Sequence, residues 1–219
     1  MKMLKFTFVV IFIISLSAFL PIKGEAKLVD EHIYLEPTEG VDRKIIEEIR
    51  KRLPLSLPMV VRVGIEEERT ILQSAYDPAR KQYDAKAVLG DITRQVVVIT
   101  VNERALAIVN ADLYVPGTDF VLGASDEKSG TCMMSLARLN NEFYGLKADN
   151  KIFLDRVIKV AMRELGESWG LGKCSNPKCV MVSFADIKEL DKKKAAFCHD
   201  CLNILHRRYG RPLTSLSLK

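Results

Sequence analysis

The sequence predicts an α/β (α+β) domain in which helices pack against a mixed, twisted sheet. Two observations support this fold class. Apolar runs rich in β-branched residues alternate with segments of helical periodicity in the first half of the chain, and helical segments dominate the second half. Of the 219 residues, 48% are apolar and 28% are charged, which is the balance of a folded globular protein. The length suits one domain with a single core.

The individual elements follow from local apolar patterns. Short apolar runs predict strands over residues 32–35, 59–65, 96–101 and 106–109, and a hairpin-like pair over 120–122 and 132–136. Apolar residues three and four positions apart predict helices over residues 41–53, 83–93, 151–169, 185–194 and 198–209. We expect Pro54 to end the first helix. We expect Asp149 or Asn150 to begin the long helix, and Gly170 to end it.

The N-terminus has the three-part pattern of an export signal. Two lysines precede an apolar run over residues 6–20, and small residues follow at the positions that a signal peptidase reads. The run is shorter than the roughly 20 residues that a membrane-spanning helix needs. We therefore predict a cleaved signal peptide over residues 1–26 and an exported domain, periplasmic or secreted, over residues 27–219. The alternative is an uncleaved signal that anchors the protein in a membrane by residues 6–20.

Charge gives little evidence for a partner. The net charge of +5 is small, and the basic residues do not form one long run. The sequence therefore predicts no nucleic-acid partner. Contact with a membrane is expected only if the N-terminal signal stays uncleaved.

One segment, MRELGESWGLGKCSNPKCVM over residues 162–181, carries a modified metal-binding pattern. Zinc peptidases of the metzincin class need His-Glu-x-x-His-x-x-Gly-x-x-His, because two histidines one helical turn apart and a third beyond a glycine turn hold the metal. The glutamate activates the metal-bound water. In this frame Glu164 occupies the glutamate position and Gly170 the glycine position. The three ligand positions hold Arg163, Glu167 and Lys173.

Four cysteines near the C-terminus form a second pattern, C-x4-C followed by C-x2-C, at Cys174, Cys179, Cys198 and Cys201. Two close pairs of this kind suit a tetrahedral zinc–thiolate site. Because an exported chain meets oxidising conditions, two disulfides are the alternative. His199, between the last two cysteines, could compete as a ligand. The remaining cysteine, Cys132, lies in an apolar stretch and is expected to be a buried core thiol.

Together with four upstream segments, these two patterns resemble the archaemetzincin family. The upstream segments are residues 80–83 (RKQY), 112–117 (DLYVPG), 135–139 (SLARL) and 142–145 (EFYG), and the resemblance spans roughly residues 34–202. It implies a compact metzincin-like domain with a long active-site helix, a catalytic zinc held by three histidines, and a structural zinc held by four cysteines that staples the C-terminal segment. Met181 corresponds to the methionine that lies beneath the catalytic zinc of metzincins; in the simpler interpretation it is a core residue. Carried over by position, the cysteine site is complete and the histidine site is degenerate.

The replacements at the ligand positions predict that the catalytic zinc is absent. Arginine has no lone pair to donate and stays protonated, lysine binds a metal only after losing a proton, and Glu167 alone does not make a zinc site. We therefore expect one structural zinc per chain. One hypothesis is a cluster of charges in its place, in which Arg163 pairs with Glu167, and Lys173 returns after the glycine turn to meet Glu164 or Glu167. The alternative is four solvated charges at the end of the helix.

The sequence therefore predicts a catalytically inactive relative, a pseudo-peptidase, that binds a peptide or a partner protein. The resemblance implies a cleft beside the long helix that holds an extended peptide against a sheet edge, and residues 120–125 resemble that edge. Two alternatives stay open. One is an active zinc metallopeptidase that hydrolyses peptide bonds with an atypical metal site using Glu164 and Glu167. The other is a purely structural exported domain.

Overall fold

A five-stranded sheet organises the chain in the computed structural model, which describes residues 31–96, 100–184 and 186–209. The strand order is β2 (Val61–Ile65), β1 (Glu31–Pro37), β5 (Glu103–Val109), β8 (Thr131–Ser135) and β7 (Gly123–Asp126). β2, β1, β5 and β8 are mutually parallel, whereas β7 runs antiparallel to β8 at the edge. In this register Leu35 of β1 lies beside Ile65 of β2 and Leu106 of β5. The predicted mixed sheet is confirmed.

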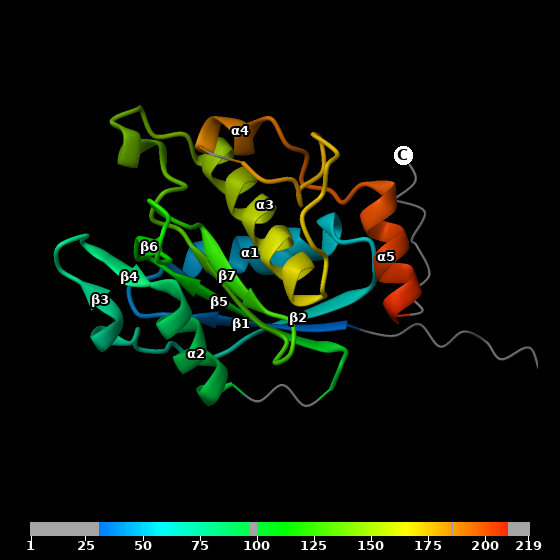
Figure 1. Ribbon diagram of the computed structural model, residues 1–219, viewed down its shortest axis with the longest axis horizontal. Coiled ribbons are helices and arrows are strands. Elements are labelled where there is room, and N and C mark those ends of the chain that lie inside the picture. The colour runs from blue at the N-terminus through cyan, green and yellow to red at the C-terminus, as the bar shows by residue number, and fades with distance from the viewer. Residues whose placement is uncertain (1–30, 97–99, 185, 210–219) are drawn as a thin grey trace, which may run out of the picture.

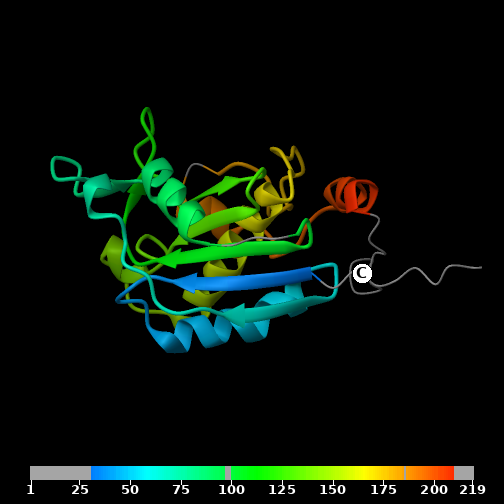
Figure 2. The same ribbon diagram turned by 90° about the horizontal axis from the view of Figure 1, so that it is seen from below.

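Helices cover both faces of this sheet. α1 (Arg43–Ser56) and α3 (Asn150–Ser168) lie on one face, and α2 (Ala85–Gln95) lies on the other (Figures 1 and 2). Successive residues of a strand point to opposite faces. Accordingly, Leu106 and Ile108 of β5 join the core beneath α1 and α3, whereas Ala107 and Val109 join the core beneath α2.

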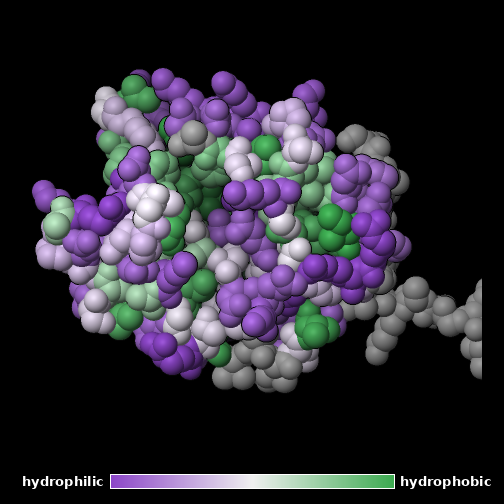
Figure 3. Space-filling view, viewed as in Figure 1, coloured by the Kyte–Doolittle hydropathy of each residue, from purple (hydrophilic) through white to green (hydrophobic). Residues whose placement is uncertain are grey.

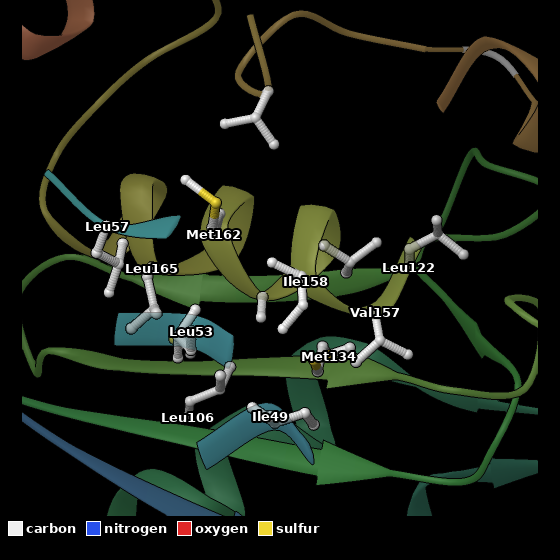
Figure 4. Packing of buried hydrophobic residues seen from close by; sticks show 14 of the residues in the cluster. Ile49, Leu53, Leu57, Leu106, Leu122, Met134, Val157, Ile158, Met162 and Leu165 are labelled. Atoms are coloured by element: carbon white, nitrogen blue, oxygen red, sulfur yellow. The ribbon is translucent and has the colours of Figure 1, made fainter. Parts of the chain in front are cut away.

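The larger of these two cores joins α1, α3 and the sheet. Figure 4 shows Ile49 and Leu53 of α1 in one cluster with strand residues Leu106 and Met134 and with α3 residues such as Val157. All five side chains are fully buried. Burial of this kind stabilises the fold by about 1.5–3 kcal/mol for each large apolar side chain.

The long helix α3 begins and ends as the sequence predicts. The Asp149 side chain accepts hydrogen bonds from the backbone amides of Lys151 and Ile152, which satisfies two of the free donors at the helix start. The helix ends where Gly170 adopts a φ of +78°, a left-handed conformation that glycine adopts without strain.

Smaller elements complete the described chain. A three-stranded sheet has the order β3 (Tyr76–Asp77), β4 (Gln82–Asp84) and β6 (Leu113–Tyr114). The 3₁₀ helices are η1 (Gln73–Ala75) and η2 (Asn141–Tyr144), and the last helices are α4 (Ile187–Asp191) and α5 (His199–Tyr209). In the described ranges no helix is both long and apolar enough to cross a bilayer. The predicted signal peptide, residues 1–26, and its possible anchor, residues 6–20, lie outside the described residues.

Two predicted boundaries in the first half are wrong. Pro54 does not end α1, which continues to Ser56. In the last turn a proline removes a single amide donor, and the Leu57 amide still donates to the Leu53 carbonyl (3.2 Å). Of the predicted strand 96–101, residues 97–99 lie outside the described residues. Val101 belongs to a turn that precedes β5.

In the second half of the chain, β7 and α4 also differ in their boundaries from the predicted strand and helix. β7 begins at Gly123 rather than at residue 120, because the Val121 amide donates to Leu113 of β6 instead (2.9 Å). The predicted helix 185–194 shortens to α4, and residue 185 lies outside the described residues. Beyond α4 the Lys194 amide donates to the Lys178 carbonyl (3.2 Å), which draws the chain away from helical geometry.

Arg156 fastens α4 to α3. Its buried guanidinium donates to both carboxylate oxygens of Asp191 (2.7 and 2.8 Å), to the Leu139 carbonyl (2.8 Å) and to Asn141 (2.9 Å). We expect Arg156→Ala to lower the free energy of unfolding by about 3 kcal/mol, because it leaves the buried Leu139 carbonyl unpaired and removes the ion pair with Asp191. Urea unfolding would measure this. Arg94→Ala, which removes an exposed arginine, should cost less than about 1 kcal/mol, and equal losses in the two variants would contradict the assignment.

Candidate functional site

A cavity of about 400 Å³ lies between the edge of the sheet and helix α3. Phe120, Leu122 and Gly123 line it from the edge side, Arg163, Glu164 and Glu167 line it from α3, and the other lining residues are Asp119, Val121, Ser183 and Phe184. The space-filling view shows a hollow on this face, with apolar walls beside hydrophilic residues (Figure 3). We call this cavity the cleft.

Glu164 lies at the base of the cleft and is only 3% exposed. The Ser125 hydroxyl of β7 donates to its carboxylate oxygen Oε2 (2.8 Å) and lies 2.9 Å from its backbone carbonyl. Burial raises the pKa of Glu164 to about 8, and the charge of Glu167 adds to this increase, whereas Arg163 and Ser125 oppose it. The carboxyl group is therefore mostly protonated at neutral pH.

Gly123 allows β7 to approach Glu164 closely. A Cβ atom at this position would lie 2.6 Å from Cδ of Glu164 and would collide with the Met133 carbonyl oxygen. Sequence reasoning did not assign a role to Gly123 or to Ser125, although both lie in or beside the segment expected to form the edge. No sequence signal marks them, because their importance comes from the packing of β7 against α3.

Arg163 fills the polar side of the cleft. It donates to Glu167 Oε1 (2.7 Å) and to the Val182 carbonyl (3.2 Å), and its Nε lies 3.9 Å from Glu164 Oε1. The predicted pairing of Arg163 with Glu167 is confirmed. The predicted return of Lys173 is wrong: its side chain is exposed and makes no ion pair with the described residues. The chain turns outward at this point because the next residue, Cys174, is held in the cysteine cluster.

The donor groups of the cleft do not fit a zinc ion. A guanidinium and an ammonium group have no lone pair at neutral pH, and Glu167 already binds the guanidinium. Within residues 31–209, apart from the few positions left undescribed, the cysteine cluster is the only group of three or more His, Cys, Asp or Glu side chains close enough to share a metal ion. The charged and acidic groups that line the cleft are therefore the Arg163–Glu167 ion pair, the neutral carboxyl group of Glu164 and the carboxylate of Asp119.

Cys174, Cys179, Cys198 and Cys201 do come together. Their sulfur atoms all lie within 4.8 Å of one another, with 3.6 Å between Cys174 and Cys198 and 3.8 Å between Cys179 and Cys201. Four thiolates around a zinc ion at about 2.3 Å are spaced by about 3.8 Å in tetrahedral geometry. All four are free thiols, which favours the metal alternative over disulfides. The cluster is thus a site that could hold a metal ion.

Hydrogen bonds favour the thiolate form of Cys179, whereas burial raises the pKa of the Cys174 thiol. Backbone amides of Asn176 and Cys198 donate to the sulfurs of Cys174 (3.4 Å) and Cys179 (3.3 Å). The contact with Cys201 lowers the pKa of the Cys179 thiol to about 5, and the same contact raises the pKa of Cys201. His199 stays outside the group: it is exposed and contacts Asn203 (3.0 Å).

The cluster fixes the C-terminal segment against the end of α3. Beyond the cysteines, Arg208 of α5 donates to Glu127 (2.6 Å) and Tyr209 donates to the Trp169 carbonyl (3.1 Å).

Met181 is fully buried beneath α3, and a Cβ atom at Gly166 would lie 2.6 Å from its sulfur. Cys132 is fully buried, as predicted, and burial raises the pKa of its thiol.

The upstream segments that carry the family resemblance contact the loop at residues 118–120, which lines the cleft. Arg80 donates to the carbonyls of Thr118 (2.8 Å) and Asp119 (3.1 Å). Arg138 makes a bidentate ion pair with Asp112 (2.6 and 2.7 Å), and its guanidinium lies 4.3 Å from the ring centre of Phe120. These contacts hold the loop that forms the outer wall of the cleft.

The arrangement of a long helix that carries Glu164 beneath an antiparallel edge strand, followed by a glycine turn, is that of a metzincin-like domain. The model of the family described as peptidase family M54 matches residues 25–207, so the chain belongs to this family.

Similarity to individual proteins and solved structures supports the same family. The archaemetzincin of Pyrococcus furiosus is 39% identical over 140 residues, which is 63% of this chain and 71% of that protein. A solved structure of a zinc-dependent peptidase from Methanocorpusculum labreanum has a TM-score of 0.70 and 32% identity, covering 79% of this chain and 99% of that chain. The archaemetzincin of Methanopyrus kandleri has a TM-score of 0.71 and 29% identity, covering 88% and 100%.

Removal of one cluster thiol should release the metal and loosen the C-terminal segment. We expect Cys179→Ser to lose bound zinc and to lower the thermal midpoint by several degrees, because metal binding contributes directly to folding. Elemental analysis and calorimetry would measure both. Cys132→Ala, which removes a thiol outside the cluster, should keep the zinc. Equal zinc contents in the two variants would rule out the cluster as the metal site.

Glu164→Gln should stabilise the fold more at high pH than at low pH. The pKa of Glu164 is about 8 in the folded chain against an ordinary value of 4.5. Folding therefore takes up a proton between these values, and stability falls as pH rises through that window. Glutamine keeps an acceptor for Ser125 and carries no charge. We expect a gain of several degrees in thermal midpoint at about pH 8.5 and none near pH 4. A gain that does not change with pH, or the same profile in exposed Glu67→Gln, would contradict this.

Proposed function

We propose that this chain is a non-catalytic member of the M54 family, a pseudo-peptidase that binds an extended peptide or a partner protein in the cleft. We also propose that it holds one structural zinc at Cys174, Cys179, Cys198 and Cys201. Arg163 carries the proposal. Its guanidinium, held by Glu167 and the Val182 carbonyl, stands at the first ligand position of the metzincin pattern.

The chemistry of peptide hydrolysis supports an inactive site. A catalytic zinc lowers the pKa of its bound water from 15.7 to about 7, and the donor groups at Arg163 and Lys173 do not provide a site for one. Glu164 keeps the position of the general base. However, its raised pKa means that it is mostly protonated at neutral pH and cannot accept a proton from water.

The sheet edge supports a binding role. β7 is the last strand of the described sheet, so one side of its backbone is free to pair with an added strand. The cleft lies directly beside it and can take a side chain of a peptide bound there. Export fits such a role, and we infer it from the sequence of residues 1–26 alone.

The histidine pattern can be restored to test the loss of catalysis. We expect the natural chain to contain one zinc per chain and to leave peptide substrates uncleaved when zinc is added. The combined variant Arg163→His, Glu167→His and Lys173→His should bind a second zinc and cleave. Elemental analysis and a quenched-fluorescence peptide assay would measure these outcomes.

A control variant separates the two zinc sites. Adding Cys179→Ser to the histidine variant should remove the structural zinc only. Cleavage by the natural chain that a chelator abolishes, or two zinc ions per natural chain, would overturn the proposal in favour of an active peptidase with an atypical metal site.

A further inference from the structure

We propose that the cleft takes the side chain of a lysine or arginine from the bound peptide, an inference that rests on the peptide-binding function proposed above. Of the described residues that line the cleft, three carry carboxyl groups (Asp119, Glu164 and Glu167) and one, Arg163, carries a cation. The metzincin pattern would place a doubly charged cation here. Apart from the neutral Glu164, the lining of this chain carries two carboxylates, Asp119 and Glu167, and one guanidinium group, Arg163.

Asp119 provides the unpaired negative charge. Its backbone carbonyl accepts from Arg80 (3.1 Å) and from Gln82 (3.0 Å), so the loop holds this residue at the rim of the cleft. Its side chain is exposed and makes no ion pair with the described residues. An incoming cation therefore meets a carboxylate without an ion-pair partner in the described part of the chain, since Arg80 contacts the backbone carbonyl of Asp119 and not its side chain.

The guanidinium group of Arg163 is already paired within the chain and offers little to an anionic ligand. Its NH2 group donates to Glu167, its NH1 group donates to the Val182 carbonyl, and its side chain is only 16% exposed. Few donors remain for an anionic side chain. Glu167, whose side chain is 36% exposed, uses Oε1 for Arg163, and its Oε2 has no hydrogen bond to the described residues. Glu167, a residue of the cleft lining, therefore keeps one carboxylate oxygen that can accept a further hydrogen bond.

The apolar walls suit the stem of a long cationic side chain. Phe120, Leu122 and Phe184 line the cleft next to the carboxyl groups. Lysine and arginine bury their methylene groups along such surfaces while the charged end stays near water. The guanidinium groups of Arg138 and Arg163 already lie over the rings of Phe120 (4.3 Å) and Phe184 (5.5 Å), so the two rings offer a ligand apolar surface only. A short acidic or amide side chain would leave these walls uncovered.

The charge of the whole molecule does not account for such a preference. The chain carries a net charge of +5, which repels cationic peptides at long range. Selection of lysine or arginine therefore has to come from the local groups of the cleft.

A random peptide library displayed on phage can test the proposal with the full chain. We expect the bound peptides to be enriched in one lysine or arginine position, and we expect Asp119→Asn to abolish this enrichment. Glu67→Gln, which removes an exposed charge near β2 at the opposite edge of the sheet, should keep it. A selected peptide whose lysine is replaced by norleucine should bind about fivefold more weakly to the natural chain, and with equal affinity to the Asp119→Asn variant.

The possible failures are distinguishable. If no peptide is enriched over a blank surface, the proposed peptide-binding function fails, and this inference fails with it. If peptides are enriched without a basic position, or if Asp119→Asn keeps the preference, only this inference is overturned. Measurement at low and high salt adds a check, because a pairing with exposed Asp119 should weaken as ionic strength rises.

Discussion

The chemistry of the cleft depends on the fact that a guanidinium group cannot donate an electron pair. In the metzincin pattern a metal ion would draw three side chains to a single point. In this chain Arg163 lies at the first of those positions and supplies one positive charge that Glu167 and two backbone carbonyls surround. The contacts of Arg163 keep the end of α3 and the backbone at Met181 and Val182 together. The side chains at the ligand positions of the cleft therefore differ from the three histidines of the metzincin pattern, and the Arg163–Glu167 ion pair lies at two of these positions.

Contacts away from the three metzincin ligand positions hold the cleft and the C-terminal segment in place. Arg138 with Asp112, and Arg80 with the loop carbonyls, hold the outer wall of the cleft. The four cysteines hold the opposite end of the molecule, where Arg208 and Tyr209 close over the last turn of α3. These contacts form a scaffold that positions an edge strand and a cavity. A binding function needs that scaffold and does not need a reacting group.

The groups packed around Glu164 determine its protonation state. A carboxylate beside a metal ion is stabilised in its charged form. Here burial and the neighbouring Glu167 favour the neutral form, and Gly123 and Ser125 bring β7 against it. The glutamate therefore acts as a buried polar contact between strand and helix. Among the described residues that line the cleft, the carboxylate without an ion pair is that of Asp119, at the rim.

The sequence by itself determined the long helix, the cysteine cluster and the altered ligand positions. Helical periodicity, an N-cap at Asp149 and a glycine at position 170 are local signals, and the spacing of the cysteines as two close pairs suits tetrahedral metal coordination. The tertiary structure decided what the sequence could not. Whether Lys173 returns to the cleft depends on how the cysteine cluster directs the chain. The roles of Gly123 and Ser125 depend on the distance between β7 and α3, and the start of β7 depends on a hydrogen bond from Val121 to a separate small sheet. Such contacts join residues far apart in the chain, so no local pattern of residue types encodes them.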